Sequence, residues 1–309
     1  MIYNNILEAV GHTPMVRLNR LPEPDSAEIL VKMEAVNVGG SIKTRTALNM
    51  IEQAENDGLI DKDSILVEPT SGNQGIGLAL VGAVKGYRTI IIMPDSVSEE
   101  RRKLVQHYGA EVRLIHDAGD IGKCIEECLN SALRMQAKNP KVFVPQQFEN
   151  PNNTLAQKNY TAQEILEQVE GPIHGFCSGI GTGGTLTGIG EVLKEKYPEM
   201  EIWAVEPENA AILAGGTIGT HMQMGIGDGI IPAILNRDIY DDIYVVTDSE
   251  AIETAKRLAR EEGLMCGISS GTNVAAAIRL AKKLGPGKTV VTVLPDTAER
   301  YYSTTLFCE

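Results

Sequence analysis

Short apolar runs rich in β-branched residues alternate along this chain with longer stretches whose apolar positions recur every three or four residues. The first pattern predicts buried strands at residues 28–32, 64–68, 89–94, 111–115, 142–144, 174–178, 201–205, 242–246 and 289–294. The second pattern predicts helices at residues 46–56, 73–84, 98–107, 122–138, 157–168, 185–196, 248–262 and 272–284. Strands that alternate with helices form βαβ units and parallel sheets, so the pattern indicates an α/β fold.

The alternation is interrupted at residues 145–153 by a segment rich in proline, asparagine and glutamine, PQQFENPNN. This break predicts two domains, each a mainly parallel twisted sheet flanked by helices. We expect a small domain, residues 39–144, inserted into a larger domain built from residues 1–38 and 145–309. Open α/β sheets bind ligands at the carboxyl ends of their strands, so the predicted site is the cleft between the two domains.

Composition and charge argue against a nucleic-acid-binding, membrane-spanning or secreted protein. The 309 residues suffice for two domains, and a net charge of −13 argues against nucleic acid as the main partner. No apolar stretch approaches the ~20 residues that span a bilayer, and the first residues lack the features of a signal peptide. We therefore expect a cytoplasmic protein with no membrane partner. The histidines and cysteines have no spacing typical of metal ligands, so no metal site is expected.

Lys43 lies in a glycine-rich run, NVGGSIKTR, between a predicted strand and a predicted helix. The small residues before it allow a flat ligand to approach. An amine that forms a Schiff base must be held in place, desolvated and kept partly neutral, and a surface lysine does not need such surroundings. We therefore interpret Lys43 as a nucleophile.

The loop EPTSGNQGIG, residues 68–77, follows a predicted strand and precedes an apolar helix. Thr70, Ser71, Asn73 and Gln74 supply hydroxyl and amide groups, and Gly72 permits a tight turn with exposed N–H groups. Such a loop at a helix N-terminus favours a small carboxylate. The alternative interpretation is an ordinary capped turn between strand and helix.

The loop SGIGTGGTLTG, residues 178–188, again connects a strand to a helix. Its glycines expose main-chain N–H groups, its threonines add hydroxyls, and the helix N-terminus favours an anion, which together predict a phosphate site. No lysine follows as in a P-loop, and the glycine spacing differs from the dinucleotide fingerprint. A compact monophosphate therefore fits better than a dinucleotide.

The loop CGISSGT, residues 266–272, precedes the last predicted helix. Its two serines, Ser269 and Ser270, either cap that helix or place a hydroxyl against a ring nitrogen in the cleft. A nucleophilic lysine, a monophosphate site and a carboxylate loop together predict pyridoxal 5'-phosphate as the cofactor and an amino acid as the substrate.

With these loops in place, the sequence resembles the cysteine synthase (O-acetylserine sulfhydrylase) and cystathionine β-synthase family, the two-domain fold-type II pyridoxal phosphate enzymes. The resemblance covers nearly the whole chain. It rests on GHTPMVRL, NVGGSIKTR, EPTSGNQG, PQQFENPNN, GTGGT, GIGDGIIP, CGISSG and PDTAERYYSTTLF. It further implies a homodimer, whereas a complex with serine acetyltransferase, known for some cysteine synthases, is left open by the sequence.

The resemblance implies a role for each loop. Lys43 would carry the cofactor as a Schiff base and later move the α-proton. Asn73 would contact the cofactor's ring oxygen, and Ser269 would face its pyridine nitrogen. The residues that would hold the cofactor phosphate are Gly181, Thr182, Gly183, Gly184 and Thr185. The residues that would bind the substrate carboxylate are Thr70, Ser71, Gly72, Gln74 and Gln147. The C-terminal Arg300, Tyr301 and Tyr302 are interpreted as structural, near a dimer interface.

The family's reaction is β-replacement on a small β-substituted L-amino acid, through an aminoacrylate intermediate to which a nucleophile adds. In the cysteine synthases the leaving group is acetate and the nucleophile is sulfide. This reaction is our main prediction. A hypothesis of another class is a non-catalytic regulatory protein that binds pyridoxal phosphate, although such a protein has no need of Lys43.

Asp228 departs from the family pattern, because the usual GIGAG reads GIGDG here. In a cleft built for anions an added carboxylate repels acetate and hydrosulfide, but it could activate water or a thiol as a base. This residue therefore supports an alternative reaction that consumes cysteine, releases sulfide and forms serine, lanthionine or a thioether. Asp228 could equally point outward from a solvated turn. Further departures from the family pattern are Val38, Thr44, Gln74 and Gln157.

Overall fold

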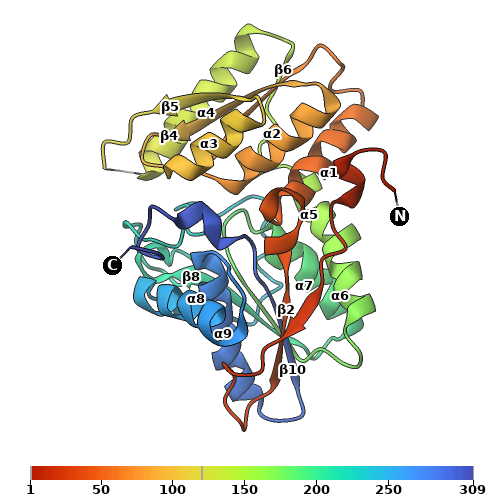
Figure 1. Cartoon of the computed structure of the whole chain (residues 1–309), viewed down its shortest axis with the longest axis vertical. Helices are drawn as coiled ribbons and strands as arrows, with labels where there is room; N and C mark the ends of the chain where they lie inside the picture. Colours follow the sequence, from red (N-terminus) through yellow and green to blue (C-terminus); the bar gives the residue numbers. More distant parts are fainter. Residues whose placement is uncertain (1, 120, 309) are drawn as a thin grey trace.

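The computed structural model describes residues 2–119 and 121–308 and contains two sheets, one above the other in Figure 1. The upper sheet has the strand order β5-β4-β3-β6, and all its neighbouring strands are parallel. The lower sheet has the order β1-β2-β10-β7-β8-β9, in which only the edge pair β1–β2 is antiparallel. The predicted α/β fold with two mainly parallel sheets is confirmed.

The strands of the upper sheet are β3 (Ile65–Pro69), β4 (Arg88–Pro94), β5 (Glu111–Ile115) and β6 (Val142–Phe143). The strands of the lower sheet are β1 (Met15–Arg17), β2 (Glu28–Lys32), β7 (Gly175–Gly179), β8 (Glu201–Pro207), β9 (Asp242–Val246) and β10 (Thr289–Val293). The α-helices are α1 (Lys43–Asn56), α2 (Asn73–Lys85), α3 (Glu99–His107), α4 (Ile121–Lys138), α5 (Pro151–Ala156), α6 (Ala162–Gln168), α7 (Gly184–Lys196), α8 (Asp248–Glu262) and α9 (Ile268–Leu284).

Each predicted strand and helix corresponds to an observed element, but several boundaries differ in ways that affect the site. Helix α1 begins at Lys43, three residues before the predicted start, so the lysine lies in the first turn. Helix α9 begins at Ile268, so Ser269 and Ser270 lie inside it, and the alternative in which they cap the helix is wrong. The predicted break at residues 145–153 contains the start of helix α5. Strand β1 was not predicted, because it has only three residues.

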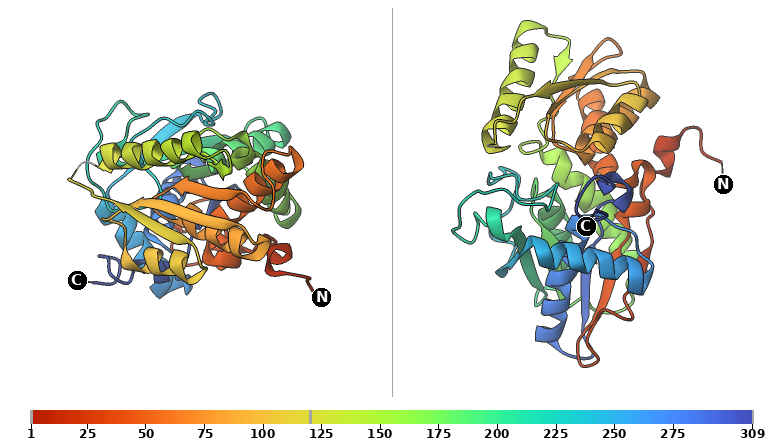
Figure 2. Two further views of the ribbon diagram at one scale, coloured as in Figure 1. Left: turned by 90° about the horizontal axis from the view of Figure 1, so that it is seen from above. Right: turned by 60° about the vertical axis from the view of Figure 1, so that its left-hand side comes forward.

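Helices cover both faces of the upper sheet, which explains why its central strand β4 is apolar at successive positions, whereas the edge strand β5 is mostly exposed. Ile91 packs with Ile76 of α2 on one face, whereas Ile90 and Ile92 pack with Cys128 of α4 on the other. Figure 2 shows α4 on the side of the sheet opposite to α2 and α3. The domain boundaries at residues 39 and 144 remain a prediction.

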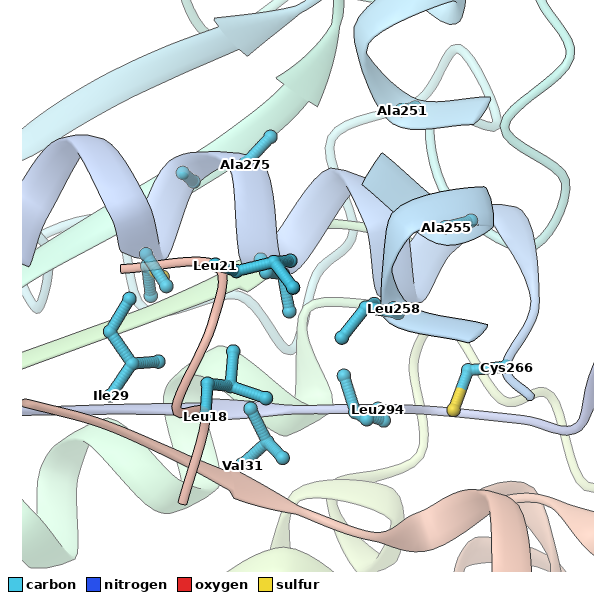
Figure 3. Packing of buried hydrophobic residues seen from close by; sticks show 14 of the residues in the cluster. Leu18, Leu21, Ile29, Val31, Ala251, Ala255, Leu258, Cys266, Ala275 and Leu294 are labelled. Atoms are coloured by element: carbon cyan, nitrogen blue, oxygen red, sulfur yellow. The ribbon is translucent and has the colours of Figure 1, made fainter. Parts of the chain in front are cut away.

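The lower sheet is likewise buried between helices. On one face, residues of β2 and β10 pack against α8 and α9, and Figure 3 shows Ile29, Val31, Leu258 and Leu294 in this cluster. On the other face, Val291 and Val293 pack with residues of α6 and α7 such as Ile189. These two layers fix the carboxyl ends of the lower strands, which point toward the upper unit (Figure 1).

A buried ion-pair network connects the first turn of α1 with residues in and beside the lower sheet. The guanidinium of Arg45 contacts Glu34 at 2.9 Å and Glu164 at 2.6 Å, and the Arg45 side chain is only 2% exposed. The Lys32 amine contacts the same Glu164 carboxylate at 2.8 Å. Burial alone raises the pKa of Glu164, but the hydrogen bonds and charges of Arg45 and Lys32 overcome this effect and lower that pKa to about 2.

No helix within residues 2–119 and 121–308 is both long and apolar enough to cross a membrane.

Candidate active site

A cleft of about 970 Å³, part of it open to solvent, lies at the carboxyl ends of strands from both sheets. It is lined by every predicted site residue except Gly184, namely Lys43, Thr70, Ser71, Gly72, Asn73, Gln74, Gln147, Gly181, Thr182, Gly183, Thr185, Asp228 and Ser269. Gly184 lies behind this wall, where it packs against Asn153. The tertiary structure therefore brings together residues from loops as far apart in sequence as Lys43 and Ser269.

Lys43 is half-buried in this cleft, in the first turn of α1. Its Nζ lies 3.4 Å from Oε1 of Gln147 and 3.4 Å from Oγ1 of Thr182. Burial lowers the pKa of Lys43 to about 8, although the carboxylates of Asp228 and Glu68 act in the opposite direction. Near neutral pH a fraction of the amine is therefore unprotonated and can act as a nucleophile or a base.

Asp228 lies in the cleft wall and does not point away from it. Its loop is held by two contacts of Gly227, whose N–H donates to the Ile180 carbonyl at 2.9 Å and whose carbonyl lies 3.0 Å from Nε2 of His221. Burial raises the pKa of Asp228, whereas the positive charge of Lys43 and that of His221, when protonated, oppose the shift. Asp228 is therefore placed to interact electrostatically with groups in the cleft and to exchange protons with them.

The glycines of residues 181–185 pack so closely against neighbouring segments that a side chain at any of them would clash. A Cβ at Gly184 would lie 2.4 Å from Oδ1 of Asn153, and a Cβ at Gly181 would lie 2.5 Å from the Gly225 carbonyl oxygen. Gly183 adopts a left-handed φ of +78° as it caps α7, whose first turn carries no acidic residue. The first N–H groups of a helix have no acceptor within it, so they are available to an anion here. These residues fit a phosphate.

Gln74 supports the predicted carboxylate site. Its side chain is 1% exposed and lines the cleft, yet neither its Nε2 nor its Oε1 has a hydrogen-bond partner among the described residues. Unpaired buried amides cost free energy, so a polar ligand is expected there. Thr70 has a different local function, because its Oγ1 accepts a hydrogen bond from the Gly72 N–H at 3.1 Å and so shapes the loop.

Asn73 is held by Asp296 and Arg300, two residues of the C-terminal motif. Its Nδ2 donates to Oδ2 of Asp296 at 2.7 Å, and its Oδ1 accepts from Nη1 of Arg300. The Tyr301 hydroxyl donates to the same Asp296 oxygen at 2.7 Å. These bonds fix the orientation of the Asn73 amide, because its nitrogen donates to a carboxylate and its oxygen accepts from a guanidinium. Asp296 and Arg300 were missed as supporting residues, although their motif was recognised.

Glu68 was also missed, although it begins the carboxylate loop in the sequence. It is fully buried and accepts hydrogen bonds from the main-chain N–H groups of Gln146 and Gln147, both at 3.1 Å. Burial raises the pKa of Glu68 to about 7, although these N–H groups and Lys43 act in the opposite direction. Gln146 has a left-handed φ of +56°, so this anchor holds a strained segment that carries Gln147 into the cleft.

Ser269 lies in the first turn of α9, is 4% exposed and lines the cleft. Four residues later, Asn273 ties this helix to the lower sheet. Its Oδ1 accepts from the Gly179 N–H at 2.7 Å, and its Nδ2 donates to the Val293 carbonyl at 2.7 Å. The hydroxyl of Ser269 is therefore presented on a rigid element, which suits contact with a ring nitrogen.

Replacing Gly181 with alanine is expected to weaken the binding of pyridoxal phosphate by about 10-fold, or ~1.4 kcal/mol. The added Cβ would meet the rigid Gly225 carbonyl, so the loop that holds the phosphate must shift. Fluorescence titration of the cofactor-free protein measures this affinity. Gly190→Ala, within helix α7, is the control, because its Cβ would meet only side chains, at 3.2 Å and beyond. Equal affinity in Gly181→Ala would contradict the phosphate assignment.

Comparison with known proteins agrees with this geometry. Residues 6–296 match the family described as pyridoxal-phosphate dependent enzyme. A cysteine synthase of Staphylococcus aureus is 48% identical over 309 residues, covering 98% of this chain and 97% of the relative. The crystal structure of an O-ureido-L-serine-bound mutant of O-ureido-L-serine synthase is 40% identical, with a TM-score of 0.94 and coverage of 99% and 94%. A hydrogen sulfide-producing enzyme from Fusobacterium nucleatum is also 40% identical, with a TM-score of 0.92 and coverage of 97% and 100%.

The site and the comparisons point to the same cofactor. An amine of lowered pKa, a glycine-rich helix N-terminus and an unpaired buried amide are the groups that pyridoxal phosphate and an amino acid require. The chain belongs to the pyridoxal-phosphate dependent enzyme family and is an enzyme of its cysteine synthase branch.

Proposed function

We propose that this enzyme is a cysteine synthase, which converts O-acetylserine and sulfide into cysteine and acetate. The observation that carries this proposal is the position of Lys43, whose partly neutral amine shares one cleft with a phosphate site and a carboxylate loop. The identity of 48% to a cysteine synthase along nearly the whole chain supports it. A purely regulatory role is disfavoured, because such a protein would not need this amine in this environment.

Pyridoxal phosphate, when bound, would supply an electron sink that makes the α-proton of the amino acid acidic. The residues of this chain then have separate tasks. Lys43 takes the α-proton, because its amine is unprotonated in part and is held near Gln147 and Thr182. Gln74 and the N–H groups of its loop bind the substrate carboxylate. Residues 181–185 would hold the cofactor phosphate, Asn73 would contact the ring oxygen, and Ser269 would face the ring nitrogen.

Asp228 favours a second candidate function, a reaction that consumes cysteine and releases sulfide. The specific observation is that this carboxylate lies in the cleft wall, close enough to Lys43 for each charge to shift the other's pKa. A carboxylate in this position can remove a proton from water or a thiol and so prepare it to add to the β-carbon. The product would then be serine, lanthionine or a related thioether.

The two functions are separated by measuring sulfide in both directions. For a cysteine synthase we expect sulfide-dependent cysteine formation from O-acetylserine, with little sulfide released from cysteine alone. In Asp228→Ala this synthesis should be retained, because sulfide already carries a negative charge and needs no base. If instead cysteine alone releases sulfide rapidly, and Asp228→Ala reduces this rate about 100-fold, the second function is correct.

We further propose that the enzyme works as a homodimer in the cytoplasm, as its resemblance to the cysteine synthases implies. Light scattering of the purified enzyme reports the mass directly, for which two copies of the 33.4-kDa chain are expected. Whether serine acetyltransferase binds is tested in the same experiment by adding that protein.

A further inference from the structure

One buried cation in the cleft has no anionic partner. Arg101, on helix α3 of the upper unit, is 2% exposed and lines the cleft. No carboxylate oxygen of the described residues lies within 4.0 Å of its guanidinium, and its Nε has no hydrogen-bond partner among them. Two other buried cations, Lys32 and Arg45, both contact Glu164. Arg300 is buried without a carboxylate partner as well, but its guanidinium donates to Oδ1 of Asn73 and to the Gly39 carbonyl, and it does not line the cleft.

The contacts that Arg101 does make are weak for a guanidinium. Its Nη1 lies 2.8 Å from the thioether sulfur of Met224, and its Cζ lies 4.9 Å from the centre of the Tyr301 ring. A thioether is a poor acceptor, and a ring face neutralises a cation only in part. A buried charge without an anion is costly, so the site is incomplete without one.

The position of Arg101 relates this unpaired charge to the substrate. A Cβ built on Gly72 would lie 3.2 Å from Nε of Arg101, so the guanidinium packs directly against the carboxylate loop. A side chain at position 72 would therefore press against the guanidinium. The amide of Gln74 and the N–H groups of the loop remain available to the α-carboxylate, which leaves Arg101 for another anion.

We propose that Arg101 forms a second anion subsite in the cleft, which takes a small carboxylate. The planar fork of a guanidinium matches a carboxylate through two parallel hydrogen bonds. Under the proposed function, on which this inference rests, that carboxylate is either the acetate released from the β-carbon or one carried by an incoming thiol. In a chain of net charge −13, with Asp228 and Glu68 beside the cleft, such an anion needs a local cation.

The test compares the holoenzyme with Arg101→Met and Arg101→Lys, and with Lys103→Met as a control. Lys103 lies on the same helix but is 68% exposed, so its replacement makes the same charge change outside the cleft. Two measurements are made: the inhibition of cysteine formation by acetate, and the rise in melting temperature with added acetate relative to chloride. We expect Arg101→Met to weaken the binding of acetate about 10- to 100-fold. Arg101→Lys should weaken this binding less, and Lys103→Met should leave it unchanged.

A second arm identifies the source of the carboxylate. Mercaptoacetate and 2-mercaptoethanol are compared as nucleophiles. If Arg101→Met removes a preference for mercaptoacetate, the subsite serves an incoming thiol. If the ratio of the rates with the two thiols stays unchanged while the binding of acetate is weakened, the subsite serves the leaving acetate. Unaltered acetate inhibition and melting in both Arg101 variants overturns the subsite. A raised KM for O-acetylserine with unaltered acetate inhibition also overturns it, because Arg101 would then bind the α-carboxylate.

The melting measurement needs no turnover, so it separates this inference from the proposed function. If the wild-type enzyme forms no cysteine but acetate still raises its melting temperature through Arg101, the subsite stands and the proposed function fails. If Arg101→Met does not fold, Arg101→Lys still decides, because it keeps the charge but loses the paired hydrogen bonds.

Discussion

Replacing Lys43 with alanine is expected to reduce cysteine formation by about 1,000-fold or more, because no other amine lines the cleft among the described residues. The visible absorption that the bound cofactor owes to the lysine should disappear, and the melting temperature of the cofactor-free protein should change little. Steady-state kinetics and an absorption spectrum measure the first two effects. Lys103→Ala, an exposed lysine, is the control and should behave as the wild type.

The same residue gives a pH dependence. Burial lowers the pKa of Lys43 to about 8, so the amine is mostly protonated below that pH and mostly neutral above it. We therefore expect the rate at which the cofactor-free protein takes up pyridoxal phosphate to rise as the pH increases through about 8. A rate that is flat between pH 7 and 9 would show that the amine is not the group that reacts.

Replacing Arg45 with methionine is expected to destabilise the protein by about 3–5 kcal/mol, although Arg45 has no predicted contact with substrate. Two buried carboxylates, Glu34 and Glu164, would lose their shared cation. The Lys32 amine would remain on Glu164, whereas Glu34 would keep only uncharged hydrogen-bond donors among the described residues. The midpoint of urea unfolding measures the loss. Arg113→Met is the matched control, because Arg113 pairs with Glu111 at a side-chain exposure of 43% and 41%, and such pairs contribute at most about 1 kcal/mol.

The network also predicts how stability falls in acid. The pKa of Glu164 is about 2 in the folded protein, below its value of about 4.5 in an unfolded chain. Between these values the unfolded state binds more protons, so the stabilisation by this carboxylate is present above pH 4.5 and is lost as the pH falls toward 2. Arg45→Met should flatten this part of the stability profile. An unchanged acid profile would mean that the pair contributes little to the folded state.

Much of the site could be predicted because the ligand-binding groups of each short loop are supplied by consecutive residues. The glycines and threonines of residues 181–185 indicate a phosphate wherever the loop is placed, because their main-chain N–H groups lie at the start of a helix. The alternation of apolar strands with helices likewise indicated both sheets, since strands that are covered by helices on both faces are mainly apolar.

Supporting residues could not be predicted in this way, because their roles depend on contacts between distant parts of the chain. Nothing local distinguishes Glu68 or Asp296 from other acidic residues, and it is the folded chain that sets Asp296 against Asn73, 223 positions earlier. The start of α9 was also predicted too late, because serines favour caps, whereas here the helix is stabilised by packing in a core.

The sequence by itself determined the α/β class, the cofactor and the lysine, because each is encoded in a local pattern of residues. Only the tertiary structure decided that Asp228 lines the cleft and that Arg101 is buried there without an anionic partner. The physical reason is that burial and the distance between charges belong to the folded chain. Burial and the distance between charges set the free-energy cost of a buried charge and the pKa of Lys43, and neither can be predicted from consecutive residues.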